Sequence, residues 1–323
     1  MHQFFYFKPM KTMLLTLAMS FLAWACQPTP KPVDTLKASE VFPKSSFPYN
    51  LNEPDRSMPM PRLLNEISGL SMSYNDKYLL AVQDESGILF VIDQATGSVK
   101  REIPFGKLGD YEGVEIVGKD VYILKNTGTL TLIKNVDQRD EQTTEPFNTE
   151  LGKENDVEGL GYDAANNRLL LACKGKAGNS SELQNRKAVY AFDLNKKALD
   201  PTPILTIGQP EVQKYLQAHA KEARLEKVIE FFSNPNEFEF SPSSIAVHPL
   251  NGNLYILSAV GNIFMAINFQ GEVVYLEKLK GKVHQQPEGI CFDSKGGMFI
   301  SNEARDDMPG MIYYFKPFGT ETK

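Results

Sequence analysis

The sequence predicts an all-β fold, a single β-propeller of five blades, and three observations lead to it. A short motif that contains an acid followed by glycine recurs at a spacing of about 45 residues. Each copy of the motif begins two β-rich runs that are separated by a polar turn. Many of these runs, such as residues 78–82 and 254–257, are almost continuously apolar, as expected for strands packed between neighbouring blades. A six-bladed ring is the alternative.

The motif also sets the expected limits of the blades, which are about 66–108, 109–155, 156–208, 237–283 and 284–318. The last blade has only three predicted strands, and the segment Ser46–Leu51 is the candidate for its fourth strand. Such a strand would close the ring and remove an open sheet edge. Residues 209–236 interrupt the repeat, and their helix-forming composition predicts one inserted, exposed helix.

The N-terminal residues 1–25 have the pattern of a secretory signal. Lys8 and Lys11 precede an apolar run at residues 13–25, and Cys26 follows directly. The run is shorter than the ~20 apolar residues that a transmembrane helix needs. We therefore expect residues 1–25 to be removed as the chain leaves the cytoplasm.

The residues around the expected cleavage point resemble the processing site of bacterial lipoproteins. Leu22–Cys26 ends in a small residue and a cysteine, so we expect Cys26 to carry lipid, including palmitate. Residues 26–44 are polar and rich in proline, which suits a tether, and 45–318 would form the propeller domain. Gln27 is not a retention signal, which favours the outer membrane in a cell that has two. A plain signal peptide followed by an incidental cysteine is the alternative.

Charge and motif content exclude several classes of function. The formal net charge is −6, without the basic patch that nucleic-acid binding requires. The 3 cysteines form no CxxC pair and no cluster with histidine, which argues against a structural zinc site. Phosphate-binding loops and the motifs of serine hydrolases and zinc proteases do not occur. We expect a monomer that contacts a membrane through its lipid and whose other partners the sequence does not identify.

Several stretches, in order along residues 45–318, resemble the SdiA-regulated protein family of exported bacterial propellers. They are Leu64–Leu70, Asp110–Gly113, Val157–Leu160, Leu171–Lys174, Ser241–Pro249, Gln286–Ile290 and Ser301–Glu303. The resemblance implies a propeller that is tethered to a membrane and lies outside the cytoplasm. It brings no agreed catalytic residues.

The acidic residues of the first and last blades are expected to meet. In a propeller the innermost strand and its neighbour form a hairpin, so the start of one lies beside the end of the other. This places Glu66 opposite Glu85 and Glu288 opposite Glu303, in blades that are neighbours in a closed ring. Oxygen ligands of this kind suit Ca²⁺, and the candidate ligands are Glu66, Asp84, Glu85, Glu288, Asn302 and Glu303. Carboxylates that only accept backbone N–H bonds are the alternative.

The same pairing in the second and third blades joins opposite charges at the mouth of the channel. Glu112 falls opposite Lys125, and Glu158 falls opposite Lys174. Structural ion pairs are the expected outcome in both blades.

Two classes of function fit these expectations. The first is a binding module that presents its acidic channel mouth to a cation, a small ligand or a protein. The second is a metal-dependent hydrolase, similar to propeller lactonases or phosphoesterases, in which Glu66, Glu112, Glu158 and Glu288 surround an ion. The sequence favours a binding module over an enzyme, because no catalytic motif accompanies the acids.

Overall fold

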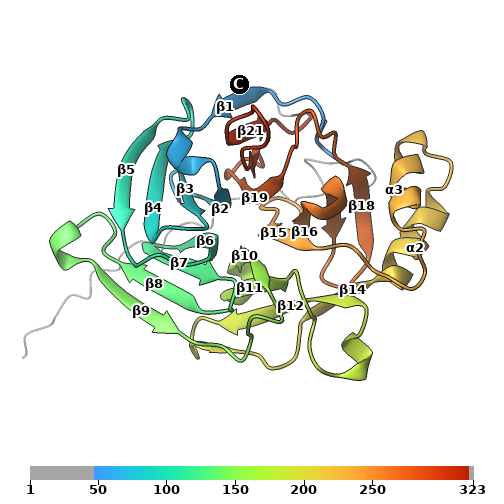
Figure 1. The fold of residues 1–323 in the computed structure, drawn as a ribbon, viewed down its shortest axis with the longest axis horizontal. Coiled ribbons are helices and arrows are strands. Elements are labelled where there is room, and N and C mark those ends of the chain that lie inside the picture. The colour runs from blue at the N-terminus through green and yellow to red at the C-terminus, as the bar shows by residue number, and fades with distance from the viewer. Residues whose placement is uncertain (1–46, 320–323) are drawn as a thin grey trace, which may run out of the picture. The chain divides into compact units, whose positions relative to one another are not determined.

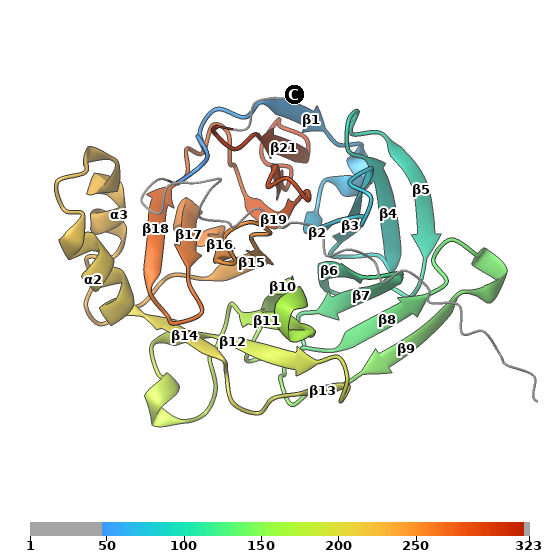
Figure 2. The same ribbon diagram turned by 180° about the vertical axis from the view of Figure 1, so that it is seen from behind.

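The computed structural model describes residues 47–319, which form five β-sheets arranged as blades around a central axis (Figure 1; Figure 2). The expected signal (1–25), the tether (26–44) and Cys26 lie outside the described residues. Among the described helices, none is long and apolar enough to cross a membrane.

Blades 1 to 3 follow one another along the chain, and the strands of each run outward from the axis in chain order. Blade 1 has β2 (Ile67–Met72), β3 (Tyr78–Gln83), β4 (Ile88–Asp93) and β5 (Val99–Pro104). Blade 2 has β6 (Tyr111–Val117), β7 (Asp120–Lys125), β8 (Leu130–Lys134) and β9 (Thr143–Phe147). Blade 3 has β10 (Val157–Asp163), β11 (Arg168–Cys173), β12 (Arg186–Asp193) and β13 (Ala198–Leu199), with β14 (Leu205–Gly208) also paired to β12.

Blades 4 and 5 complete the ring. Blade 4 has β15 (Pro242–Val247), β16 (Leu254–Ser258), β17 (Ile263–Ile267) and β18 (Val273–Lys278). Blade 5 has β19 (Pro287–Phe292), β20 (Met298–Asn302), β21 (Met311–Phe315) and, from the other end of the chain, β1 (Arg56–Pro59). The innermost strands touch in the order β2, β6, β10, β15, β19 and again β2, which confirms the predicted five-bladed propeller. Short 3₁₀ turns connect some strands, at Arg62–Leu64, Arg139–Glu141, Ala164–Asn166, Ser181–Leu183 and Val260–Asn262.

The closing strand differs from the one expected at Ser46–Leu51. Strand β1 pairs antiparallel with β21 instead, with Arg56 opposite Tyr314. The apolar residues of the earlier segment pack into the core between blades 4 and 5, where Tyr49 and Leu51 are buried. The Tyr49 hydroxyl also lies 2.7 Å from His248 Nε2. Their apolar character therefore reflects burial against side chains and not hydrogen bonding within a sheet.

The insertion forms two short helices in place of the single exposed helix expected. They are α2 (Gln209–Ala218) and α3 (Glu226–Phe231), joined by a 3₁₀ turn at Ala223–Leu225. The chain leaves helical geometry at His219, which allows both helices to contact the outer strand β18 of blade 4.

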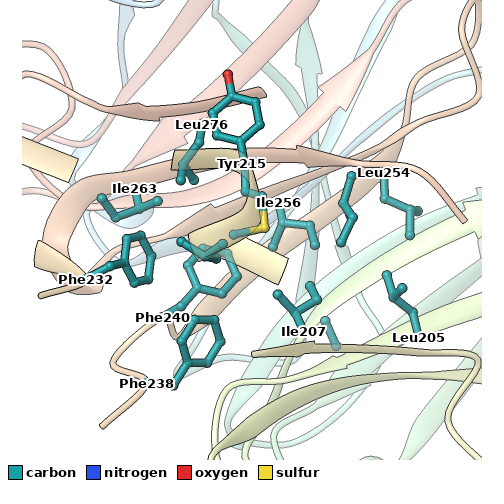
Figure 3. Packing of buried hydrophobic residues seen from close by; sticks show 14 of the residues in the cluster. Leu205, Ile207, Tyr215, Phe232, Phe238, Phe240, Leu254, Ile256, Ile263 and Leu276 are labelled. Atoms are coloured by element: carbon teal, nitrogen blue, oxygen red, sulfur yellow. The ribbon is translucent and has the colours of Figure 1, made fainter. Parts of the chain in front are cut away.

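Each inserted helix buries an apolar stripe. Val212 and Leu216 of α2 and Val228 of α3 join the core of blade 4. Figure 3 shows this cluster, with Tyr215 and Phe232 from the insertion near Ile263 and Leu276 of the blade. The insertion thus covers an outer strand that would otherwise expose its unpaired edge.

Candidate functional site

The innermost strand of each blade carries a β-bulge close to its first residue. In blades 2 to 5 the extra, unpaired residues are Glu112, Glu158, Ser243 and Glu288. In blade 1 the irregularity falls between Ile67 and Leu70. A bulge turns a side chain away from the normal alternation of a strand. In blades 2, 3 and 5 the acid-glycine motif is therefore the sequence signature of a bulge that redirects a glutamate.

The glycine of the motif permits neighbouring innermost strands to approach closely. A Cβ atom on Gly69 would lie 2.7 Å from Gly113 Cα, and one on Gly113 would lie 2.5 Å from Leu160 Cβ. These contacts are shorter than real Cβ atoms make, so a larger residue would push adjacent blades apart. The glycines keep the ring tight at the level of the bulges.

The redirected acids influence one another across the ring. We use the term entry mouth for the acids Glu66, Asp84, Glu112, Glu158, Glu288 and Glu303 together with Lys174, at the end where the innermost strands begin. Burial, with smaller contributions from Glu158, Asp110 and Glu288, raises the pKa of Glu112 to about 9. Because these carboxyls come from blades 2, 3 and 5, their mutual repulsion indicates that they converge.

The acids of blades 1 and 5 are coupled in the same way. Burial and the neighbouring Glu303 raise the pKa of Glu288 to about 7. Burial, Glu66 and Asp84 raise the pKa of Glu303 to about 7. Burial, Glu66 and Glu85 raise the pKa of Asp84 to about 6. The sequence predicts these acids in one sector, and the effects of Glu66 and Asp84 on the pKa of Glu303 link blades 1 and 5.

The hairpin register in these two blades differs slightly from the expected one. The backbone N–H of Asp84 donates to the carbonyl of Glu66 at 3.4 Å, so Glu66 lies opposite Asp84 and not Glu85. Glu66 and Glu85 are exposed. In blade 5, Gln286 and not Glu288 lies opposite Glu303, whose backbone N–H donates to the Gln286 carbonyl at 3.0 Å. Gln286 Nε2 donates to Glu288 Oε1 at 3.3 Å and also to Glu303 Oε2, and so bridges the two acids. Gln286 is not among the residues predicted for this site.

Two side chains of this sector, those of Asp84 and Asn302, have buried polar atoms that make no hydrogen bond in the described part of the chain. Asp84 Oδ1 is buried and has no hydrogen-bond partner in the described part of the chain. Asn302 is fully buried, and both polar atoms of its side chain are likewise without a partner there. Buried polar atoms are normally satisfied, so each exception needs an explanation.

Of the two ion pairs predicted at the channel mouth, the pair in blade 3 forms and the pair in blade 2 does not. Lys174 Nζ lies 2.6 Å from Glu158 Oε1. Burial outweighs this attraction and raises the pKa of Glu158 to about 8. Lys125, by contrast, places its ammonium 4.7 Å from the centre of the Tyr111 ring and not against Glu112. Among the ion pairs of residues 47–319, Lys174 supplies the one cation that contacts an acid of the entry mouth.

The donor set has the chemistry of a calcium site but is not arranged as one. No group of three or more His, Cys, Asp or Glu side chains within residues 47–319 has a geometry that could hold a metal ion. The oxygens of Asp84 and Asn302 that lack partners are nevertheless hard donors of the type that Ca²⁺ takes. Glu288 and Glu303 would supply the charge.

The structure also contains a buried acid that the sequence analysis passed over. Glu115 of β6 is only 9% exposed. Two residues after the motif glycine, where blade 2 has Glu115, the other blades have Ser71, Gly161, Ala246 and Cys291. A large charged residue at a position where the other blades have small residues is the sequence signal that could have identified Glu115. Cys173 and Cys291 are buried and free.

Comparison with known proteins agrees with this architecture. The family model described as SdiA-regulated matches residues 49–198 and 209–316, which is most of the chain. The chain belongs to the SdiA-regulated family. The match covers the bulged strand and its neighbour in all five blades, and it includes the helical insertion.

Solved structures resemble the chain at low sequence identity. Glutaminyl cyclase of Myxococcus xanthus is 12% identical, with a TM-score of 0.53, over 82% of this chain and 95% of that one. A luciferin-regenerating enzyme is 10% identical, with a TM-score of 0.47, over 83% and 96%. A streptogramin B lyase is 12% identical, with a TM-score of 0.40, over 77% of this chain and 65% of that one. At such identities, the similarity to the cyclase reflects the fold alone.

Proposed function

We propose that this protein is a lipid-anchored binding module outside the cytoplasm, and that its entry mouth binds a cation, with Ca²⁺ the best candidate. The observation that carries the proposal is the group of coupled, largely buried carboxyls that faces a single lysine. Burial and mutual repulsion hold the pKa of Glu112, Glu288 and Glu303 well above the usual range. Such a group must keep protons or take up cations.

The sector between blades 1 and 5 is the part of the mouth best suited to a divalent ion. Lys174 forms its ion pair with Glu158 of blade 3. It also attracts Glu288 and Glu303, but the group that bridges these two acids is the neutral amide of Gln286. Asp84 and Asn302 carry buried oxygens with unused acceptor capacity. A calcium ion would offset the repulsion and satisfy these oxygens together.

Calcium is expected to stabilise the folded protein. A ligand that binds only the folded state contributes about 2.7 kcal/mol when its concentration is one hundred times Kd. Differential scanning calorimetry should therefore show a higher melting temperature with calcium chloride. The double variant Glu288→Gln with Glu303→Gln should lose that increase.

The matched control is Glu154→Gln. Glu154 precedes the same innermost strand as Glu158, but it is exposed and pairs with Lys176. This variant should keep the full response to calcium. A melting temperature that calcium does not change would show that protons, and not a divalent ion, relieve the repulsion.

The alternative function, a metal-dependent hydrolase, can be tested with the same calcium-loaded protein. It requires an open coordination position and a base beside the ion. Turnover of a lactone or a phosphoester by the calcium-loaded protein, lost in the double variant, would favour it over a binding module.

The membrane anchor rests on the sequence around Cys26. If Cys26 is lipidated, Cys26→Ala should move the protein from the membrane fraction to the soluble fraction, because the acyl chains supply the membrane affinity. Fractionation followed by immunoblotting would measure this. A variant that stays in the membrane fraction with its leader uncleaved would contradict lipidation at Cys26.

A further inference from the structure

The innermost strands end on the side of the ring opposite the entry mouth, and we call this side the exit mouth. A cavity of about 250 Å³ lies there, and residues of all five blades line it. From blades 1 to 5 they include Ser71, Glu115, Tyr162, Ala246 and Cys291. This cavity shares none of its lining residues with the entry mouth.

Glu115 places a carboxyl group inside this cavity. The side chain is nine-tenths buried, and its Oε2 accepts a hydrogen bond from Ser71 Oγ of blade 1 at 2.9 Å. Backbone hydrogen bonds from Ile116 and from Tyr162 of blade 3 also reach the carboxyl. Because the equivalent positions of the other blades are small, Glu115 has room to extend across the channel.

The carboxyl has no cationic partner in the described part of the chain. None of the ion pairs within residues 47–319 involves Glu115, Asp76 or Asp293, the three acids that line the cavity. No lysine or arginine lines the cavity. The nearby His248 is buried, which lowers its pKa to about 3 and keeps it neutral.

Aromatic side chains complete the walls. Tyr162 and Phe292 line the cavity, and Tyr74, which is 79% exposed, lies at its edge. Aromatic faces attract cations, and a buried carboxylate accepts strong hydrogen bonds from an ammonium group. The volume lies just below the ~300 Å³ at which pockets for drug-sized ligands begin, so it suits a small molecule.

We propose that the exit mouth binds a small primary alkylammonium ion. Its N–H groups donate to Glu115 and Ser71, and its alkyl chain lies against Tyr162, Phe292 and Tyr74. This site is independent of the cation proposed for the entry mouth.

Proton release gives the proposal a second readout. Burial raises the pKa of Glu115 to about 8, so the empty site holds a proton at neutral pH. The other titratable groups around it are Asp76, Asp293, Cys291, Tyr74 and Tyr162; burial raises the pKa of Asp293 and of Cys291. Binding of an ammonium ion displaces the Glu115 proton, so affinity should increase between about pH 6 and pH 9, while an alkylamine stays charged up to about pH 10.

Isothermal titration calorimetry of the full chain with n-butylammonium chloride tests the site. We expect saturable binding of one ion, with a heat that depends on the ionisation enthalpy of the buffer because a proton is released. Glu115→Gln should weaken binding at least about tenfold, since the amide removes the charge. Tyr74→Ala should weaken it about two- to fivefold, and this exposed residue can be changed without disturbing the core.

Controls separate this site from the entry mouth and from simple filling of a cavity. Glu288→Gln at the entry mouth and prior loading with calcium should leave the affinity for n-butylammonium unchanged. Equal binding of n-butanol would overturn the proposal, because the cavity would then select only apolar shape. Lack of saturable binding at about 10 mM, or full binding by Glu115→Gln, would overturn it as well and identify Glu115 as a structural plug of the channel.

Discussion

Blades 2 and 3 begin with the same motif and arrive at different charge arrangements. Each has a bulged glutamate at its entry and a lysine at or just beyond the end of its second strand. Lys174 pairs with Glu158 at 2.6 Å, whereas Lys125 lies over the ring of Tyr111. The residue before the bulge is Tyr111 in blade 2 and Val157 in blade 3. The ring of Tyr111 therefore gives Lys125 a contact that Val157 does not offer Lys174.

The comparison also explains why Glu112 has the higher pKa of the two. Burial affects both glutamates, but only Glu158 has an ammonium group beside it. At neutral pH Glu112 keeps its proton and offers Lys125 little attraction. The aromatic contact and the protonated carboxyl thus support each other.

The largest expected difference between the two blades comes from their lysines. Lys174→Met should destabilise the protein by about 2 kcal/mol, less than for a fully buried pair because Lys174 is one-third exposed. Lys125→Met should cost less than about 1 kcal/mol, the usual value of a partly exposed cation–π contact. Urea denaturation at pH 8 would measure both. Equal losses would contradict the assignment of Lys174 as the cation of the entry mouth.

A second effect is expected from Glu112, and it depends on pH. A carboxyl whose pKa is higher in the folded state than in the unfolded state contributes stability that is complete below about pH 4.5 and is lost as pH rises through the folded value. For Glu112 that value is about 9. Glu112→Gln cannot ionise, so this variant should gain stability relative to the natural protein as pH rises from about 4.5 to about 9.

Thermal unfolding between pH 5 and pH 9 would follow this change. Glu154→Gln is the control, because the exposed Glu154 has its pKa lowered by Lys176. The control should not reproduce the gain at high pH. If the melting temperatures of Glu112→Gln and of the natural protein differ by a constant amount from pH 5 to pH 9, Glu112 is already ionised at pH 5.

The ring of five blades was predictable because one short motif marks each entry. The Glu158–Lys174 pair was also predictable, because counting residues outward from the hairpin turn places the two side chains near each other. The bulges were not predictable from alternation, and the register in blade 1 shifted by one residue as a result, so that Glu66 meets Asp84. A shift of one position changes which side chains meet, even where the strands themselves are correctly located.

The closing strand was missed for a different physical reason. Tyr49 and Leu51 are apolar, as residues of a buried strand are, but their side chains are buried between blades 4 and 5 without the segment joining a sheet. Strand β1 alternates exposed and buried residues, and it presents a weaker signal although it makes the sheet hydrogen bonds. Apolar composition predicts burial, and it does not tell which backbone groups pair.

The pairing of β1 with β21 also determines when the ring can close. One strand comes from near the start of the chain and the other from near its end, with Arg56 opposite Tyr314. Contacts between residues so far apart in sequence form slowly, because a long loop must be ordered before they contribute. During synthesis the first blades can assemble with an open edge, but the last sheet waits for the final strand. We expect closure to be a late step in folding, and an intermediate without it to expose sheet edges that promote aggregation.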